Sequence, residues 1–109
     1  MERSREQILA ANEAVAREVN EGIERGHWPG EEDRPAAYKC ECSRIDCNRL
    51  IELTPAEYET VRGHPRCFLV APGHEDPQIE TVVNRTPKYL VVEKRGAAGA
   101  VAEDADPRG

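Results

Sequence analysis

The sequence predicts a small α+β protein with an N-terminal amphipathic helix, a small antiparallel β-sheet and one further short helix. Near the N-terminus, apolar residues recur at spacings of three and four, as on one face of a helix. From residue 37 onward, short β-prone runs alternate with Gly, Pro, Asn and Asp, as in strands joined by turns. We therefore expect three parts, which are residues 1–36, 37–95 and 96–109.

Residues 1–36 are predicted to form an amphipathic helix followed by an acidic loop. The apolar stripe indicates a helix over residues 5–25, which Gly26 can end as a C-terminal cap. The stripe consists of Ile8, Ala11 or Asn12, Val15, Val19 and Ile23. We expect it to pack on the rest of the chain, since a small core needs every apolar face, with packing on a partner as the alternative.

Residues 37–95 are predicted to form the main α+β domain, beginning with a hairpin. Alternation after Ala37 predicts a short strand that carries Cys40 and Cys42 on one face. Residues 49–53 follow as a second strand, so the hairpin has a cysteine-bearing tip. Thr54-Pro55-Ala56-Glu57 then has the features of a helix start, and we expect a short helix as far as about residue 63.

Three more strands are predicted in the remainder of this domain. Residues 66–71 form an apolar run that Pro72-Gly73 ends, which places His74 on a loop. Residues 78–84 and 88–95 predict an antiparallel hairpin, although 78–85 is also compatible with a short helix. Beyond the hairpin the chain is mostly Gly, Ala, Asp and Glu, so we expect a flexible acidic tail over residues 96–109.

Charge and hydropathy disfavour two classes of function, which are nucleic-acid binding and membrane association. The net charge of -6 arises from the flanks, because residues 1–36 carry -4, residues 37–95 are balanced and residues 96–109 carry -2. Nucleic-acid binding is disfavoured for lack of a basic footprint, although Arg44, Arg49, Arg62 and Arg66 are available for a local patch. No apolar stretch approaches the roughly 20 residues of a membrane span, and no signal core follows the N-terminus. We therefore expect a cytoplasmic protein without a membrane partner.

Three of the four cysteines are clustered. In a reducing compartment, cysteines are more often metal ligands or core residues than disulfides. Cys40 and Cys42 are two apart on a predicted strand and project to the same side, while Cys47 can approach from the far side of the tip. These thiols predict a structural zinc ion, which can contribute on the order of 10 kcal/mol to the folding of so small a domain.

A structural zinc ion requires a fourth ligand from elsewhere in the chain. We favour His74, because a loop after Pro72-Gly73 can present its side chain. Cys67 lies in an apolar run, where a cysteine usually packs in the core. His64 at a helix end and His27 beside Trp28 are typical of surface or loop residues, and all three remain alternatives.

Several segments also resemble a family of small, functionally uncharacterised bacterial proteins. The likeness covers about residues 13–95 and lies in Arg17-Glu18-Val19-Asn20-Glu21, Tyr38-Lys39-Cys40-Glu41-Cys42 with Cys47, Ile51-Glu52-Leu53-Thr54, Glu57-Tyr58, Val61-Arg62, Phe68, Pro72-Gly73-His74-Glu75 and Val91-Val92-Glu93-Lys94. In that family the three cysteines and a Gly-His-Glu turn occur together. The resemblance thus implies Cys40, Cys42, Cys47 and His74 as the ligand set, without Cys67, and implies no activity.

The sequence predicts a zinc-stabilised protein-interaction or regulatory module that contacts a protein partner through the N-terminal helix or the C-terminal tail. An enzyme is disfavoured, because four ligands would close the site and neither a phosphate-binding loop nor a zinc-deaminase signature is present. No small-molecule substrate is evident. The alternatives are a transcription-related nucleic-acid-binding zinc protein, which would use Arg44 and Arg49, and a thiol-based redox switch.

Overall fold

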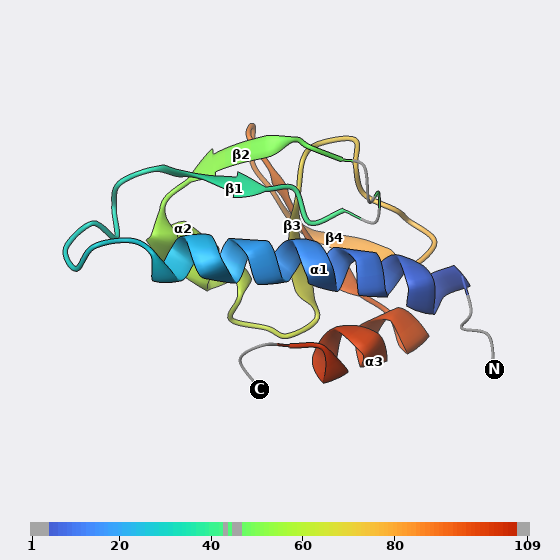
Figure 1. The fold of residues 1–109 in the computed structure, drawn as a ribbon. Helices are drawn as coiled ribbons and strands as arrows, with labels where there is room; N and C mark the ends of the chain where they lie inside the picture. The colour runs from blue at the N-terminus through green and yellow to red at the C-terminus, as the bar shows by residue number, and fades with distance from the viewer. Residues whose placement is uncertain (1–4, 43, 45–46, 107–109) are drawn as a thin grey trace.

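The computed structural model describes residues 5–42, 44 and 47–106, with side chains from Asn12 onward. It confirms the α+β class (Figure 1). The elements are α1 (Arg5–Arg25), β1 (Ala36–Lys39), β2 (Leu50–Leu53), α2 (Pro55–Val61), β3 (Cys67–Val70), β4 (Glu80–Arg85), β5 (Leu90–Lys94) and α3 (Gly96–Asp104).

The strands form two antiparallel sheets instead of one. One sheet is the β1-β2 hairpin, and the other has the strand order β3-β5-β4. In Figure 1, α1 runs across the strands and α3 lies along one side of it. The main core lies between these layers and includes Tyr38, Leu53, Tyr58, Phe68, Leu69 and Val92.

Local signals located several elements correctly. Thr54 and Glu57 form the predicted capping box at the start of α2, each side chain bonding to the backbone N–H of the other residue. The β4-β5 hairpin is also present, so the helical alternative for residues 78–85 is wrong. The β1-β2 hairpin forms as well, but β1 ends at Lys39 and the cysteines follow it in the connection to β2.

The C-terminal segment differs from the expected flexible tail. Residues 96–104 form α3, whose buried residues are Ala98, Gly99 and Ala102. These small residues allow α3 to approach α1 closely. The guanidinium of Arg17 on α1 donates to the Ala102 carbonyl at 3.4 Å. The composition of this segment suggested nothing to bury, yet small residues are sufficient where the partner supplies a long side chain.

The helix α1 packs on the rest of the chain, but through a different face from the one predicted. Of the predicted stripe, Ile23 is half-buried and packs on the core, but Val15 and Val19 are 59% and 48% exposed. The face turned inward carries Glu13, Arg17 and Asn20. The side chains of Ile8 and Ala11 lie outside the described set. The prediction failed because the inward face is polar, and polar side chains can be buried where each has a partner.

Asn20 shows how this polar face is stabilised. Its carboxamide accepts the Lys39 N–H at 2.6 Å and donates to the Lys39 carbonyl at 2.7 Å. The side chain therefore satisfies both backbone groups at the end of β1, much as a neighbouring strand would. Its amide also donates to the Glu41 carboxylate at 2.9 Å, which ties α1 to the connection that carries the cysteines.

The other inward polar residues of α1 are paired too. Arg17 stacks on the Phe68 ring, with 3.7 Å from the guanidinium carbon to the ring centroid, and donates to the Pro65 and Cys67 carbonyls. Three more buried ion pairs join α1 or β4 to other parts of the chain. They are Glu21 with Arg62 at 2.6 Å, Glu13 with Lys94, and Glu80 with Lys94.

Replacing Asn20 with alanine should lower the free energy of unfolding by about 2 kcal/mol, because buried partners on Lys39 and Glu41 lose their hydrogen bonds. Chemical denaturation measures this change. Asn84→Ala on the exposed side of β4 is the matched control and should change stability by no more than about 0.5 kcal/mol. Equal effects of the two substitutions would contradict the structural role of Asn20.

Candidate metal centre

Three thiols and one imidazole converge beside the end of β1. The Sγ atoms of Cys40, Cys42 and Cys47 and a ring nitrogen of His74 all lie within 4.8 Å of one another. The Nδ1 atom of His74 is 3.7 Å from the Cys40 Sγ and 3.5 Å from the Cys47 Sγ. Ligands of one tetrahedral zinc ion, at Zn–S and Zn–N distances of about 2.3 and 2.0 Å, lie about 3.6 Å apart. The four residues thus form a cluster that can hold a metal ion.

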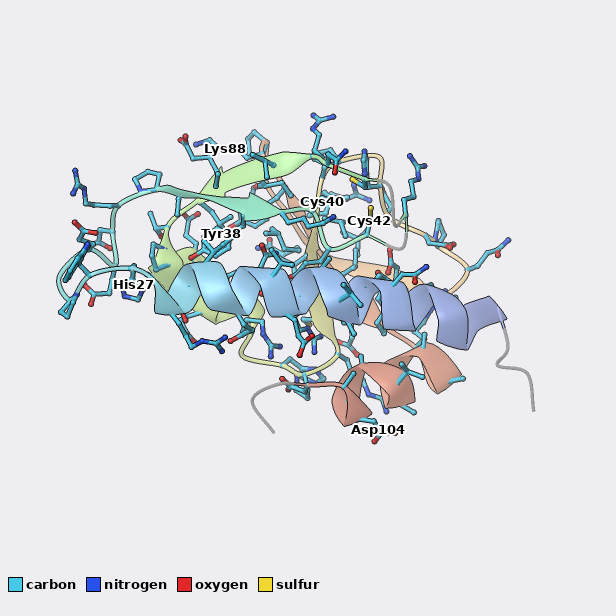
Figure 2. The ribbon with its side chains drawn as sticks, in the orientation of Figure 1. His27, Tyr38, Cys40, Cys42, Lys88 and Asp104 are labelled. Carbon is cyan, nitrogen blue, oxygen red and sulfur yellow. The ribbon has the colours of Figure 1, made fainter. Side chains whose placement is uncertain are left out.

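The backbone around β1 positions the thiols. Cys40 follows the last residue of β1, and its N–H still donates to the Arg49 carbonyl at 2.9 Å, so the hairpin ladder orients it. The connection then turns back, with the Cys47 N–H donating to the Arg44 carbonyl at 3.1 Å. Cys40 and Cys42 lie where the chain leaves β1 (Figure 2). All three cysteines are buried, which suits a structural site more than an open catalytic one.

A tight turn after β3 presents His74. The His74 N–H donates to the Ala71 carbonyl at 2.9 Å, and Gly73 has a φ of +89°. Proline followed by a glycine with positive φ is the preferred sequence of a type II β-turn. The same turn supplies the Ala71 N–H, which donates to the Cys40 Sγ at 3.2 Å. One turn therefore contributes both the fourth candidate ligand and a hydrogen bond to the first.

Glu41 fixes the segment between the first two thiols. Its side chain points away from the cluster into the core, where it is fully buried. One carboxylate oxygen accepts the Leu69 N–H at 2.9 Å, and the other accepts from the Tyr58 hydroxyl at 2.6 Å and from Asn20. Burial raises the pKa of Glu41, and these three donors oppose that rise. A side chain held from three elements leaves Cys40 and Cys42 little freedom to move.

The electrostatics of the cluster favour a thiolate at Cys42. A hydrogen bond from Cys40 lowers the pKa of the Cys42 thiol to about 4; His74 and the Arg44 backbone also lower it, while burial opposes them. The same hydrogen bond, together with burial, raises the pKa of Cys40. A metal ion would draw protons from the thiols that bind it, because a coordinating thiol is deprotonated.

The cluster borders a hollow in the surface. Its lining consists of Arg44, Cys47, Asn48, Arg49 and His74. The half-buried His74 and the buried Cys47 belong both to this lining and to the cluster, so the hollow adjoins the thiols. Two positive side chains at the rim lie beside a group of potential thiolates, which is an electrostatically favourable arrangement.

The structure places none of the alternative fourth ligands in the cluster. Cys67 lies on β3, where its carbonyl accepts from Arg17 and its thiol is buried. His64 is exposed beyond α2, and its Nδ1 accepts the Arg66 N–H at 3.2 Å. His27 follows α1, with its Nε2 3.9 Å from a Glu32 carboxylate oxygen. Of the candidates considered from the sequence, His74 alone meets the three thiols.

Sequence reasoning missed the residues that support the cluster. Alternation along the strand places Glu41 on the opposite face from Cys40 and Cys42, as the structure has it, but does not identify its partners Asn20 and Tyr58. The sequence does contain a signal for a buried polar face of α1, because polar residues recur there at helical spacing. They are Glu13, Arg17, Asn20 and Glu21. A polar stripe of this kind can mark a buried face as well as a solvated one.

Comparisons with known proteins give no further guide to the chain. No protein-family model, curated protein or solved structure matches it. Among the helices of the described ranges, none combines the length and the apolar character that a membrane crossing needs. The chemistry of the cluster is therefore the main basis for a functional proposal.

Replacing Gly73 with alanine should weaken metal binding, because alanine disfavours the positive φ that the turn before His74 requires. Among the described residues no atom lies within 4 Å of an added Cβ, so the effect that we expect comes from the backbone conformation. Gly30→Ala is the matched control, with a φ of +90° and open space but a location in the loop after α1. Both variants should lose about 1 kcal/mol of stability.

Competition with a chromogenic chelator measures the metal affinity of the two variants. Only Gly73→Ala should show weaker binding than the unsubstituted protein. Equal metal affinities for Gly73→Ala and Gly30→Ala would show that the turn does not position His74 for binding.

Proposed function

We propose that this protein binds one zinc ion through Cys40, Cys42, Cys47 and His74. The observation that carries the proposal is the convergence of these four ligand atoms within 4.8 Å. Thiolates are soft ligands, and three of them with one imidazole in a compact group are typical of structural zinc sites. The same four residues are the set that the family resemblance implies, so we also propose that the chain is a member of that family.

The role of the metal in this proposal is structural. Four protein ligands fill a tetrahedral shell and leave no position for substrate or water. The three cysteines lie in the β1-β2 connection and His74 lies between β3 and β4, so a shared ion would cross-link the two sheets. Such a link can contribute on the order of 10 kcal/mol to folding, as much as the entire stability of many domains.

The charges around the cluster suit zinc. One divalent ion with three thiolates and a neutral imidazole has a formal charge of about -1. Arg44 and Arg49 line the adjoining hollow, where they can offset that charge. Charge compensation therefore accounts for both arginines without a nucleic-acid partner, which a chain of net charge -6 would disfavour.

We further propose that the zinc-stabilised fold acts in the cytoplasm as a protein-binding module. A metal used for stability leaves the biological role to the surface of the protein. Over the part of α1 whose side chains the structure describes, the large apolar residues that are exposed are Val15 and Val19, on the face opposite the core. Exposed apolar side chains that lie together on one face often mark a contact with another protein.

The purified protein should contain one zinc ion per chain. Cys47→Ser and His74→Ala should abolish stoichiometric zinc, because each removes one of the four ligands. Elemental analysis of protein purified without added chelator measures the content. A chelator should lower the temperature of thermal unfolding of the unsubstituted protein and have little effect on that of these two variants.

Matched controls separate ligand loss from general damage. Cys67→Ser and His27→Ala change the same residue types outside the cluster, so both should retain the zinc. Unsubstituted protein that is folded and free of zinc after purification from zinc-supplemented cells would refute the proposed metal site.

A further inference from the structure

The outward face of α1 is an unusual surface for a helix on a small protein. Val15 and Val19 are four residues apart and therefore adjacent on this face, and both are largely exposed. They line a groove together with Glu18, Glu21 and Arg25. The inward face of the same helix is polar, so α1 exposes apolar side chains and buries charged ones.

Gly22 is the second unusual feature of this face. It lies inside α1, where glycine weakens a helix relative to alanine. Its φ is negative, and an added Cβ would meet nothing within 4 Å. Neither backbone conformation nor packing within the chain requires glycine here. A missing side chain on an exposed helix face does allow the close approach of another protein segment.

Two opposite charges flank the valines. At about 100° per residue, Glu18 and Arg25 lie on one side of the line from Val15 to Gly22, and Val19 lies on the other. Both charged side chains are exposed, and neither has an ion-pair partner within the part of the chain that the structure describes. The face therefore offers one acidic and one basic group along the same edge.

We propose that this face pairs with the same face of a second copy, the two α1 helices running antiparallel about a twofold axis. In that arrangement the edge of α1 that carries Glu18 and Arg25 meets the same edge of the second copy, and the two helices run in opposite directions. Glu18 of each copy therefore faces Arg25 of the other. A parallel twofold pair would instead place Glu18 and Arg25 against the edge that carries Val19. The antiparallel dimer is thus the twofold arrangement that matches the charges.

The same arrangement accommodates Val19 and two glycines. When Glu18 is level with Arg25 of the second copy, Val19 is level with the interval between Gly22 and Gly26 of that copy. Both glycines are exposed and present no side chain, so each Val19 enters a shallow gap in the other helix. This inference names a partner for the proposed protein-binding role, and it does not depend on the metal.

Sedimentation equilibrium of the zinc-loaded full chain tests the dimer. Glu18→Arg and Arg25→Glu should each raise the dimer Kd about tenfold, because two ion pairs become two repulsive contacts. The double variant Glu18→Arg with Arg25→Glu should restore the original Kd to within about threefold, since opposite charges face each other again. Restoration by the double variant is specific to an antiparallel pair of identical faces.

Two further variants test the apolar contacts. Val19→Asp should raise the Kd about a hundredfold, whereas Val83→Asp, at a valine with 51% exposure on β4, should leave it unchanged. Gly22→Leu should abolish dimerisation and leave the monomer folded, because Gly22 is exposed and a Cβ added there meets no atom within 4 Å in the part of the chain that the structure describes. Zinc content measured on every variant separates loss of the dimer from loss of the metal.

An unsubstituted protein that remains monomeric up to about 1 mM, a concentration at which even weak specific pairs associate, would overturn the inference. A dimer that Val19→Asp disrupts but the charge-swapped double variant does not restore would overturn the antiparallel arrangement.

Discussion

The buried carboxylate of Glu41 is the contact on which the rest of the structure depends, because it joins three elements at the segment that carries the thiols. It accepts hydrogen bonds from Asn20 on α1, Tyr58 on α2 and the Leu69 backbone on β3. Its own N–H donates to the Leu69 carbonyl at 2.7 Å, so Glu41 also joins the two sheets. A buried charge is tolerable only with such partners, and their positions determine where Cys40 and Cys42 can lie.

The polar inward face of α1 likewise requires a partner for each buried polar group. Buried ion pairs and hydrogen bonds contribute less net stability than apolar contacts of equal size, because the charges lose their hydration. They do require particular partners, whereas apolar surfaces can slide past one another. Arg17 on Phe68, Asn20 on Lys39 and Glu21 on Arg62 therefore specify one position of α1 along the sheets. The outward face of α1 is then not needed for packing on the core.

The proposed zinc ion and the polar network would act on different parts of the same junction. The network fixes the inner side of the segment at residues 40–42, and the metal would fix its outer side to the turn at His74. The two sheets share no strand, so these contacts connect layers that would otherwise rely on the core alone. The proposed dimer lies on the far side of α1 from this junction, which allows assembly without disturbing the metal site.

The sequence by itself determined the features that depend on neighbouring residues. The capping box at Thr54, the extent of α1 and the gathering of three cysteines at a hairpin tip all follow from local spacing and turn chemistry. For residues 78–85 the sequence allowed a hairpin or a short helix, and the structure has the β4-β5 hairpin. The tertiary structure decided which face of α1 is buried and that residues 96–104 are helical, and it brings His74, the ligand that the sequence favoured, to the thiols while Cys67 lies elsewhere. These outcomes depend on partners that are distant in sequence, such as Arg17 for α3 and the Ala71 turn for Cys40, and the spacing of residues within one segment does not identify such partners.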